Sequence, residues 1–342
     1  MSLKSIQRKR EYTKYVVDKR LCYYEPPRDK LQKTFAQELS SSLVQKQKSI
    51  NPKFFYDKKG SKLFEEICKL SEYYLTRTEI SILRQLYDKL PSHLNGDFRL
   101  VELGSGSSKK TRILLSILER LHKHIEYFPI DISKILKESS TILLDDYENL
   151  HITGIIDNYE SGLEFVKNYD NKKNLIAFLG SSFGNFDYEH GLKFLQKINS
   201  SMKKNDLFLI GLDLVKDKTV LERAYNDSQG VTAKFNLNVL SRINSELDSN
   251  FNINKFAHHA FYNEYKNRVE IYLRSLENQT VKIHKAGMVL PIKQDELIHT
   301  ENSYKYTISK IKEIFSISSF RIKDIWFDEK QYFCLVLLSK ND

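Results

Sequence analysis

The stretch Leu100-Val101-Glu102-Leu103-Gly104-Ser105-Gly106-Ser107 is an apolar strand that runs into a glycine turn. Because glycine tolerates positive φ and has no side chain, such a turn lets the backbone approach a bound nucleotide closely. The helix predicted to begin near Ser107-Ser108 points its free N–H groups at the same place. Dinucleotide-binding turns carry a third glycine three residues further on, where this chain has Lys109. The stretch therefore favours a nucleoside-bearing cofactor without a pyrophosphate, such as S-adenosylmethionine, although Gly-Ser-Gly also occurs in ordinary loops.

The middle of the chain alternates apolar runs with helical patterns. We expect strands over residues 98–103, 125–130, 151–156, 175–179 and 207–214, with helices such as 111–121 between them. Strands that alternate with helices predict a parallel, doubly wound sheet, in which ligands bind at the carboxyl ends of the strands. The residues that lie just past such ends are Gly104, Gly106, Asp131, Asp157 and Asn185. Their shared position makes them candidates for one site.

The flanks of this region have other patterns. Residues 1–30 show little hydrophobic periodicity and are expected to form a loosely ordered leader, whereas 31–90 reads as helical. After Asp217 we expect a helix at 219–248, antiparallel strands at 258–262 and 269–276, a further segment at 296–304 and a helix at 306–315. A hairpin of 322–327 and 332–338 closes the chain. The predicted fold class is α/β: a Rossmann-like sheet over 31–216, completed by strands of 316–342, with a smaller α+β substrate-binding lid over 217–315.

Composition limits the class of protein and its surroundings. The chain has 342 residues, of which 41% are hydrophobic and 29% charged, as in a soluble globular protein. No apolar run reaches the roughly 18 residues that cross a bilayer, and the basic N-terminus lacks the apolar core of a signal peptide. Three scattered cysteines and nine histidines without ligand spacing predict neither disulfides nor a metal site. We expect a cytoplasmic monomer.

The net charge of +10 is compatible with nucleic-acid binding, but the lysines are spread over the whole chain among many acidic residues. Only the segment from Lys4 to Arg20 is locally basic. We therefore expect no nucleic-acid partner and no membrane partner.

Three polar residues past the strand ends have both a binding and a structural interpretation. Asp131 stands where nucleotide-binding folds place the acid for the ribose hydroxyls, and equally where an Asx turn or helix cap would stand. Asp157 has the same two interpretations. In the binding one, its carboxylate accepts a hydrogen bond from an adenine amino group. Asn185 ends a glycine-bracketed loop, where its amide can donate and accept hydrogen bonds, or where it simply occupies a left-handed turn.

Aromatic and acidic residues outside the sheet suggest an amine-bearing substrate. Tyr56, Tyr73 and Tyr74 could surround a cationic nitrogen, although tyrosines more often pack in the core. Glu301 and Ser303 lie two residues apart, so on a strand they face the same side. A carboxylate and a hydroxyl that converge suit a ring with N–H groups, such as imidazole; the alternative is a solvated face.

Several long segments carry a resemblance. They read PKFFYDKKGSKLFEEICKLSEYYLTRTEISIL (52–83), VELGSGSSKKTRILL (101–115), FPIDIS (128–133), FLGSSFGN (178–185) and GLDLVKDKTVLERAYNDSQGVTAKFNLNVLSRINSEL (211–247). From Pro52 to the C-terminus the chain resembles the histidine-specific, S-adenosylmethionine-dependent Nα-methyltransferases of ergothioneine biosynthesis. The resemblance implies a class I methyltransferase fold and methylation of the α-amino group of L-histidine, up to the trimethylated product.

The resemblance also implies roles for individual residues. The positions that would hold the cofactor are Gly104, Gly106, Lys110, Asp131, Asp157 and Asn158. The positions that would hold the substrate's amine and carboxylate are Tyr56, Tyr73, Asn185 and Tyr225, while Glu301 and Ser303 would hold the imidazole. A methionine that lines the family's substrate pocket is Ile271 here, which keeps the pocket apolar and changes its shape.

The reaction expected from this resemblance is an in-line displacement, in which the neutral α-amine attacks the sulfonium methyl group. Alignment of the two groups supplies most of the acceleration. Tyr56 is expected to help remove the amine's proton and, with Asn185, to orient its lone pair.

Other activities remain open at this stage. The first alternative is methylation of another amino acid, such as an indole amino acid; Glu301 favours histidine, because a carboxylate buried without an N–H partner is costly. An RNA-modifying protein and a non-catalytic scaffold are the other classes. The former would need clustered basic residues, and the latter has no need of the intact glycine turn.

Overall fold

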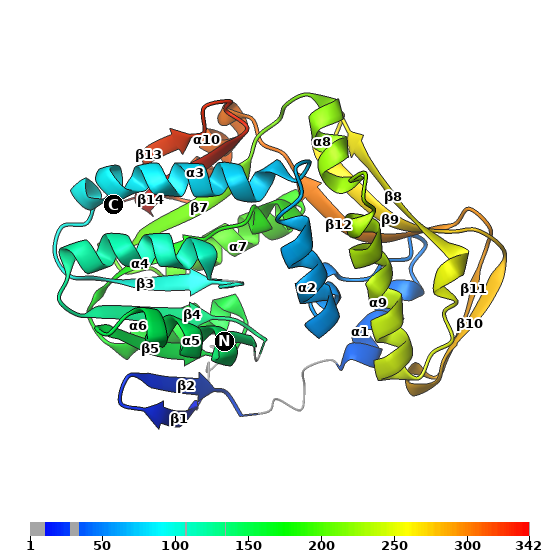
Figure 1. Cartoon of the computed structure of the whole chain (residues 1–342), viewed down its shortest axis with the longest axis horizontal. Coiled ribbons are helices and arrows are strands. Elements are labelled where there is room, and N and C mark those ends of the chain that lie inside the picture. The colour runs from blue at the N-terminus through cyan, green and yellow to red at the C-terminus, as the bar shows by residue number, and fades with distance from the viewer. Residues whose placement is uncertain (1–10, 28–33, 107, 134, 342) are drawn as a thin grey trace, which may run out of the picture.

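The computed structural model describes residues 11–27, 34–106, 108–133 and 135–341. Outside this part of the chain lie the first ten residues of the expected leader, residues 28–33, Ser107, Lys134 and the last residue. Figure 1 shows two lobes, a large one around a central sheet and a small one in which a helix lies against antiparallel strands. The expected α/β class is confirmed.

Among the described residues, the central sheet has nine strands in the order β1-β2-β5-β4-β3-β6-β7-β14-β13. Its parallel strands are β3 (Phe98–Leu103), β4 (Ile125–Ile130), β5 (Leu150–Ile155), β6 (Lys173–Phe178) and β7 (Leu207–Asp213). The C-terminal strand β14 (Phe333–Lys340) runs antiparallel to both β7 and β13 (Phe320–Phe327). Every residue of β3 and of β7 is buried, as expected for strands that helices cover on both faces.

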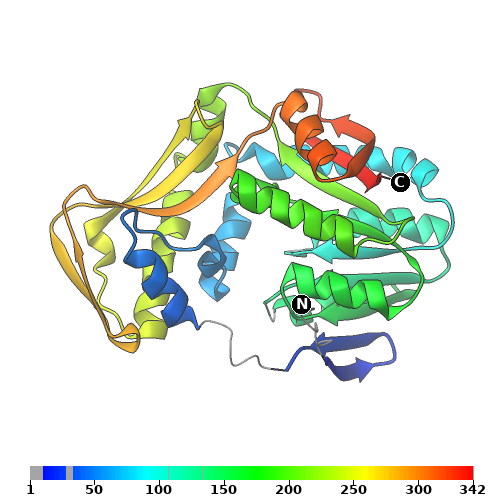
Figure 2. The ribbon, with the colours of Figure 1, turned by 180° about the vertical axis from the view of Figure 1, so that it is seen from behind.

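Helices cover the two faces of this sheet. Buried side chains of α3 (Tyr74–Lys89), α4 (Lys109–Leu121) and α5 (Ile135–Asp146) pack on one face, and those of α6 (Tyr159–Tyr169), α7 (Tyr188–Ser201) and α10 (Ile308–Ile317) on the other. Figure 2, seen from behind, shows α7 and α10 over the second face. In α4 the buried positions recur at helical spacing, at Thr111, Leu114, Leu115 and Leu118.

The strand order reverses at β3, because β4 pairs with one of its edges and β6 with the other. In doubly wound sheets the ligand binds beside such a reversal, at the carboxyl ends of the strands. The topology therefore brings the glycine turn after β3, Asp131 after β4, Asp157 after β5 and Asn185 after β6 to the same edge of the sheet.

The small lobe, called the cap below, is inserted between β7 and α10. Its helices are α8 (Lys218–Tyr225) and α9 (Val231–Leu247), and its strands are β8 (Phe256–Asn263), β9 (Arg268–Ser275), β10 (Gln279–Ile283), β11 (Met288–Ile292) and β12 (Leu297–Tyr304). The chain enters and leaves the cap at one point, since the N–H of Val215 donates to the carbonyl of Tyr306 at 3.0 Å. The cap is thus anchored beside the carboxyl end of β7.

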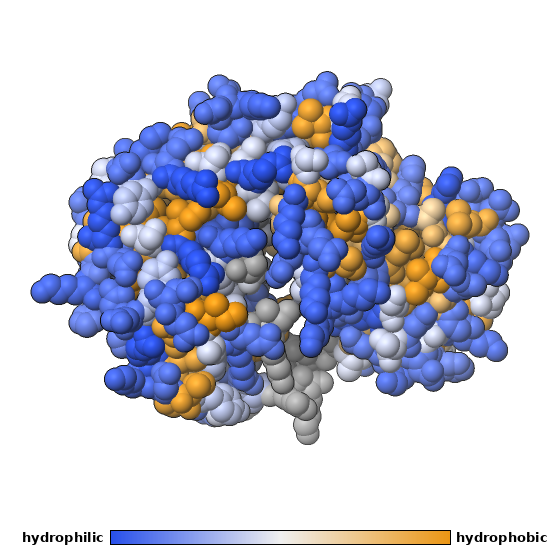
Figure 3. Space-filling view, viewed as in Figure 1, coloured by the Kyte–Doolittle hydropathy of each residue, from blue (hydrophilic) through white to orange (hydrophobic). Residues whose placement is uncertain are grey.

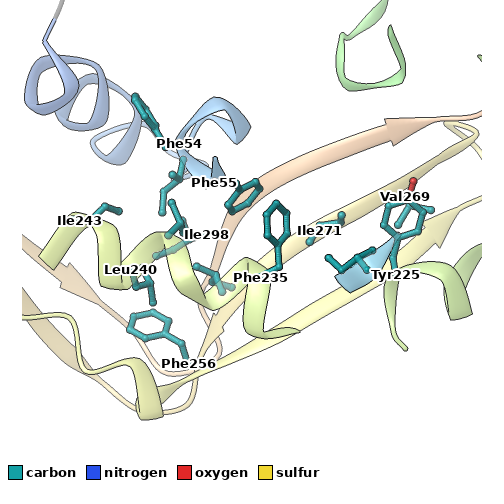
Figure 4. Packing of buried hydrophobic residues seen from close by; sticks show 14 of the residues in the cluster. Phe54, Phe55, Tyr225, Phe235, Leu240, Ile243, Phe256, Val269, Ile271 and Ile298 are labelled. Carbon is teal, nitrogen blue, oxygen red and sulfur yellow. The ribbon is translucent and has the colours of Figure 1, made fainter. Parts of the chain in front are cut away.

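The N-terminal helices belong to the cap and not, as the expected division at 31–216 had it, to the sheet lobe. Buried residues of α1 (Phe35–Leu43) and α2 (Lys58–Ile67) join the core of α9 and the cap strands. Figure 4 shows Phe54 and Phe55 against α9, with Phe235 and Ile271 close by. Sequence periodicity shows that these helices have an apolar face, but it does not show which lobe covers that face.

Part of the expected leader is ordered, which corrects the prediction for residues 13–25. β1 (Thr13–Asp18) and β2 (Leu21–Glu25) form a hairpin, and β2 extends the central sheet by pairing in parallel with β5. Leu21 and Tyr23 are buried in this contact, whereas all of β1 is exposed. With so few buried positions, the hairpin has little hydrophobic pattern for sequence reasoning to detect.

Two further details of the cap differ from expectation. The helix expected at 219–248 is two helices, separated by a turn in which Gly230 has a φ of +67°. The hairpin β10–β11 was missed, since its residues alternate between buried and exposed for only five positions per strand.

The surface of the described residues has no large apolar area on the face drawn in Figure 3, where small apolar areas are scattered over both lobes among hydrophilic residues. No helix in the described ranges is both long and apolar enough to span a bilayer.

Candidate active site

The glycine turn after β3 needs glycine at Gly104. Its φ is +76°, and a Cβ atom placed there would lie 2.7 Å from the hydroxyl oxygen of Tyr159. Gly106 also has a positive φ, of +49°, but open space would surround its Cβ. Gly104 therefore keeps the turn free of a side chain at a crowded point, and Tyr159, which sequence reasoning did not select, is the neighbour that crowds it.

The two aspartates past β4 and β5 already have local partners. Asp131 accepts a hydrogen bond from the backbone N–H of Ser133 at 2.8 Å, which is the Asx turn weighed above. Burial raises the pKa of Asp131, with backbone hydrogen bonds opposing. Asp157 accepts from the backbone N–H of Asn158 at 2.8 Å and from the hydroxyl of Tyr12 at 2.7 Å. Asn158 itself caps α6 by accepting from the N–H of Ser161.

Lys110, another expected cofactor residue, forms an ion pair with Glu79 at 2.8 Å. Glu79 is only 1% exposed and also accepts from the backbone N–H of Gly180 at 2.8 Å. Glu79 on α3 thus connects α4 with the loop after β6, and sequence reasoning missed it. Polar contacts between separate elements leave no mark in local sequence.

These residues fit a nucleoside-bearing cofactor. The cradle at Gly104 would be filled by a Cβ of any other residue, and carboxylates follow both β4 and β5. Carboxylates accept from ribose hydroxyls and from an amino group, whereas no residue of the turn after Gly106 supplies the third glycine of a pyrophosphate site.

A pocket opens inside the cap, between α2 and the cap elements inserted after β7. Its space is about 410 Å³, a volume that includes open solvent at the mouth. Five of the expected substrate residues are among those that line it; the full lining is Phe55, Tyr56, Phe64, Ile67, Tyr73, Tyr225, Thr232, Phe235, Asn236, Ile271 and Glu301. Aromatic rings therefore dominate this pocket, and Glu301 is the carboxylate among them.

A β-bulge in β12 aims Glu301 at this pocket. His299 lies opposite Tyr272 of β9, and Glu301 lies opposite Ile271, so Thr300 is the extra residue. The bulge lets Glu301 share a face with Ile271, while the imidazole of His299 turns away and bonds Asn302. Bulges commonly redirect side chains beside active sites. The sequence predicted that Glu301 and Ser303 share a face, but not which face it is.

Glu301 meets Asn185 across the two lobes. With its amide oriented to satisfy hydrogen bonding, Asn185 donates to the carbonyl of Asn302 and to Oε1 of Glu301, each at 3.2 Å. Burial raises the pKa of Glu301 to about 7, and the positive charge of Lys305 opposes that rise. Near neutral pH, this carboxyl can therefore be present in either form.

Ser303 lies behind the pocket wall. Its Oγ is 2.7 Å from the hydroxyl of Tyr225, and Nζ of Lys305 donates to Ser303 at 2.8 Å and to Tyr225 at 3.0 Å. Lys305 in turn pairs with Asp213 at 2.7 Å, and the side chains of both are fully buried. Sequence reasoning found Ser303 and Tyr225 but not the buried pair of Lys305 and Asp213.

Two of the three tyrosines that line the pocket, Tyr56 and Tyr73, are neutral phenols. Burial raises the pKa of Tyr56, and the nearby charge of Glu301 raises it further; the same kinds of effect raise the pKa of Tyr73. Tyr56 is 42% exposed and Tyr73 is 8% exposed, and both line the pocket. Both can hold a ligand by hydrogen bonds and ring contacts at neutral pH.

Two polar atoms in the pocket lining have no hydrogen-bond partner within the described part of the chain. They are Oγ1 of Thr232 and Oδ1 of Asn236. Buried polar atoms are normally paired, so these atoms are further candidates for ligand contact that the sequence did not single out. No cluster of His, Cys, Asp and Glu suited to a metal ion occurs among the residues described.

The chain is similar to known proteins over most of its length. Residues 35–340 match the model of a family described as histidine-specific, S-adenosylmethionine-dependent methyltransferases. The histidine N-alpha-methyltransferase of Mycobacterium tuberculosis is 36% identical over 89% of this chain and 94% of that protein. Ergothioneine biosynthesis protein 1 of Neurospora crassa is 30% identical over 84% of this chain, a match that covers 32% of that protein. The L-tryptophan methyltransferase trpM of Psilocybe serbica is 27% identical over 84% of this chain and 87% of that protein.

The family match includes the glycine turn, both lobes and the pocket inside the cap. The chain therefore belongs to the S-adenosylmethionine-dependent, histidine-specific methyltransferase family.

Proposed function

We propose that this chain methylates the α-amino nitrogen of L-histidine and repeats the transfer up to the trimethylated product. The observation that carries the proposal is Glu301, the one carboxylate among the described residues that line a mainly aromatic pocket. A carboxylate in such surroundings is costly unless an N–H group pairs with it. The ring N–H of a neutral imidazole supplies a second partner beside the amide of Asn185. The Tyr225–Ser303 pair, in which the resemblance assigned Tyr225 to the amine and carboxylate, supplies a hydroxyl for the second ring nitrogen.

The cofactor side of the site is built by the turn and the acids past the strands. S-adenosylmethionine, when bound, supplies an electrophilic methyl group. Gly104 leaves room for it, Asp131 accepts from its ribose hydroxyls and Asp157 from its adenine amino group. Gly106, Lys110 and Asn158 complete the set, with Lys110 acting from its ion pair with Glu79.

The α-amine of the substrate must be neutral to attack. Since the phenol of Tyr56 keeps its proton at neutral pH, Tyr56 orients the amine by hydrogen bonding and does not act as a phenolate base. When Asn185 donates to Glu301, its amide oxygen is left to accept an N–H of the amine. The amine therefore binds in its neutral form, with its proton lost to water, and its lone pair is held in line.

Repeated transfer requires a pocket with room for the methyl groups added to the substrate nitrogen. After the third transfer this nitrogen is a quaternary ammonium with a permanent positive charge, which the pocket must also accommodate. Faces of tyrosine and phenylalanine rings attract quaternary ammonium groups. Tyr56, Tyr73 and Phe235 all line the pocket, which supports trimethylation. The three free cysteines among the described residues and the dispersed lysines support a cytoplasmic enzyme that acts on a free amino acid, as a monomer and without a nucleic-acid or membrane partner.

An indole amino acid is the second candidate substrate, because the related trpM protein is named for tryptophan. The test is incubation of the purified protein with isotopically labelled S-adenosylmethionine and a panel of amino acids, followed by mass measurement of the products. We expect mono-, di- and trimethylated histidine. Preferred methylation of tryptophan, or no transfer to any amino acid, would refute the proposal.

A further inference from the structure

Lys305 is a fully buried cation that the proposed reaction does not use directly. It follows Ser303 by two residues at the end of β12, and its side chain lies beside Tyr225. Its three hydrogen bonds go to Oδ2 of Asp213, Oγ of Ser303 and Oη of Tyr225, at 2.7, 2.8 and 3.0 Å. An ammonium group has three protons, so all of them are used.

Within this cluster, one hydroxyl proton of Ser303 or Tyr225 is not used in a hydrogen bond. Ser303 and Tyr225 each accept from Lys305, and one of the two hydroxyls donates to the other across 2.7 Å. The pair has two hydroxyl protons, of which this internal bond uses one. The remaining O–H has no acceptor inside the cluster of Asp213, Lys305, Ser303 and Tyr225. When Ser303 donates to Tyr225, the free proton is that of the phenol, and because Tyr225 lines the pocket, this proton is available to a ligand there.

Asp213 keeps Lys305 in its protonated, charged form. Burial alone would raise the pKa of Asp213, but Lys305 and Lys216 outweigh it and hold that pKa below its ordinary value. Burial alone would lower the pKa of Lys305, yet Asp213 and Tyr225 raise it. Lys305 therefore keeps its three protons near neutral pH, and it donates to both hydroxyl oxygens.

We propose that Lys305, held by Asp213, is a positioning residue that makes the Tyr225–Ser303 pair a hydrogen-bond donor to the substrate. The inference rests on the proposed function. It explains selectivity, because a donor at this pair and an acceptor at Glu301 match a ring with one bare nitrogen and one N–H group. Neutral imidazole has both, whereas indole has only the N–H group. A site built around such bonds strongly rejects an analogue that lacks one of them.

Substitution of Lys305 by Met tests the proposal, with Lys216→Met as the matched control. Lys216 also bonds Asp213 and is nearly buried, but its partners are Tyr74 and the carbonyl of Leu214, not the pair. Calorimetry should show histidine binding weakened at least tenfold in K305M and less than twofold in K216M. Binding of S-adenosylmethionine should change less than twofold in both. Lys305→Arg, which keeps charge and donors, should recover part of the histidine affinity.

The pH profile separates positioning from a loss of structure. The groups that face Glu301 are the phenols of Tyr56 and Tyr73, the amide of Asn185 and the charge of Lys305, and only Lys305 is charged near neutral pH. Without that charge the carboxyl of Glu301 ionises at higher pH. The pH midpoint of histidine binding should therefore move upward in K305M, whose affinity stays below that of the unaltered protein even above this midpoint, while K216M keeps the original midpoint.

Equal histidine affinity in K305M and the unaltered protein, or an equal loss of both ligands, would overturn the inference. Should K305M melt below the assay temperature, Lys305→Gln, which keeps an amide donor without the charge, takes its place with the same expected pH shift. If the unaltered protein binds no histidine, the proposed function fails; if it does and K305M binds equally well, only the role of Lys305 fails.

Discussion

The amide nitrogen of Asn185 lies 3.2 Å from Oε1 of Glu301, so the loop after β6 meets the cap strand β12 inside the site. Asn185 stands at the edge of the sheet where the cofactor residues gather, and Glu301 lines the substrate pocket. A ligand that bonds either residue therefore touches the contact between the lobes. Substrate and cofactor are expected to bind more tightly together than separately.

Glu301→Gln should weaken histidine binding by about 10- to 100-fold near pH 8, because a hydrogen bond to a charged group contributes roughly 1.5–3 kcal/mol. With a pKa of about 7 in the unaltered protein, the carboxylate forms as the pH rises, so wild-type affinity should increase between pH 6 and pH 8. E301Q should keep only the smaller increase that comes from deprotonation of histidine itself, whose imidazole and amine also lose protons as the pH rises. Calorimetry at pH 6 and pH 8 measures the histidine affinity of both proteins. The control is Glu296→Gln, which removes the ion-pair partner of Lys48. An equal loss in E296Q would argue against the assigned role.

Asn185→Ala should lower the rate of methyl transfer more than it lowers the melting temperature. The residue bonds Glu301 and the backbone of Asn302, and its oxygen is proposed to orient the amine, so the loss should appear at saturating histidine as well as in its affinity. Steady-state kinetics with thermal unfolding measures both. A rate unchanged in saturating substrate would restrict Asn185 to binding.

The parallel sheet and its ligand-binding edge were predictable from sequence. Each strand from β3 to β7 is a buried apolar run, and the candidates past their ends follow from the general geometry of such sheets. The hairpin β1–β2 was not predictable in this way, because Leu21 and Tyr23 are its buried core residues and β1 contributes none.

The sequence predicted many residues of the candidate site but not the hydrogen bonds and ion pairs that join them. The i, i+2 spacing of Glu301 and Ser303 shows that they share a face, but the bulge at Thr300 decides that this face is the pocket. Asp213, Glu79 and Lys305 are joined to the site by hydrogen bonds between distant parts of the chain. Such bonds depend on tertiary packing, for which a single sequence has no periodic signal.

Gly104→Ala should destabilise the turn and weaken S-adenosylmethionine binding. A left-handed backbone costs a non-glycine residue about 1–2 kcal/mol, and the added methyl group would also meet the hydroxyl of Tyr159 at 2.7 Å. Gly106→Ala, with open space around it, should show the backbone cost alone. Urea unfolding and calorimetry measure the two effects.

A second substitution separates the steric cost of G104A from its backbone cost. In the double variant with Tyr159→Phe, the hydroxyl is gone and the nearest ring atom is 3.7 Å away, so stability should recover toward that of G106A. If the two substitutions instead add their costs, the close approach to Tyr159 is not what requires glycine.

Glu102, the acid of the opening stretch, should make stability depend on pH. It is 2% exposed and accepts from Thr111 and Tyr127, and burial raises its pKa to about 7 from 4.5. Between these two values the folded state holds a proton that the unfolded state has lost, so the free energy of unfolding falls as the pH rises. The fall is at most about 3 kcal/mol.

Glu102→Gln should remove this contribution. Urea unfolding of the variant at pH 5 and pH 8 should show a smaller difference than the unaltered protein, whereas Glu119→Gln, at an exposed position of α4, should keep the full difference. A pH dependence identical in E102Q and the unaltered protein would mean that Glu102 titrates normally.

Tyr12 precedes the hairpin, outside the span of 35–340 that matches the family model. Its hydroxyl donates to Asp157 at 2.7 Å, and its ring packs against Phe165 with centroids 4.7 Å apart. If Asp157 holds the adenine amino group, Tyr12→Phe should weaken S-adenosylmethionine binding by about three- to tenfold, since one hydrogen bond contributes roughly 0.5–1.5 kcal/mol. Tyr15→Phe on β1, where Tyr15 is 49% exposed, should leave cofactor binding unchanged. Calorimetry with the cofactor distinguishes the two variants, and equal affinities would show that the hairpin supports the sheet without contributing to the cofactor site.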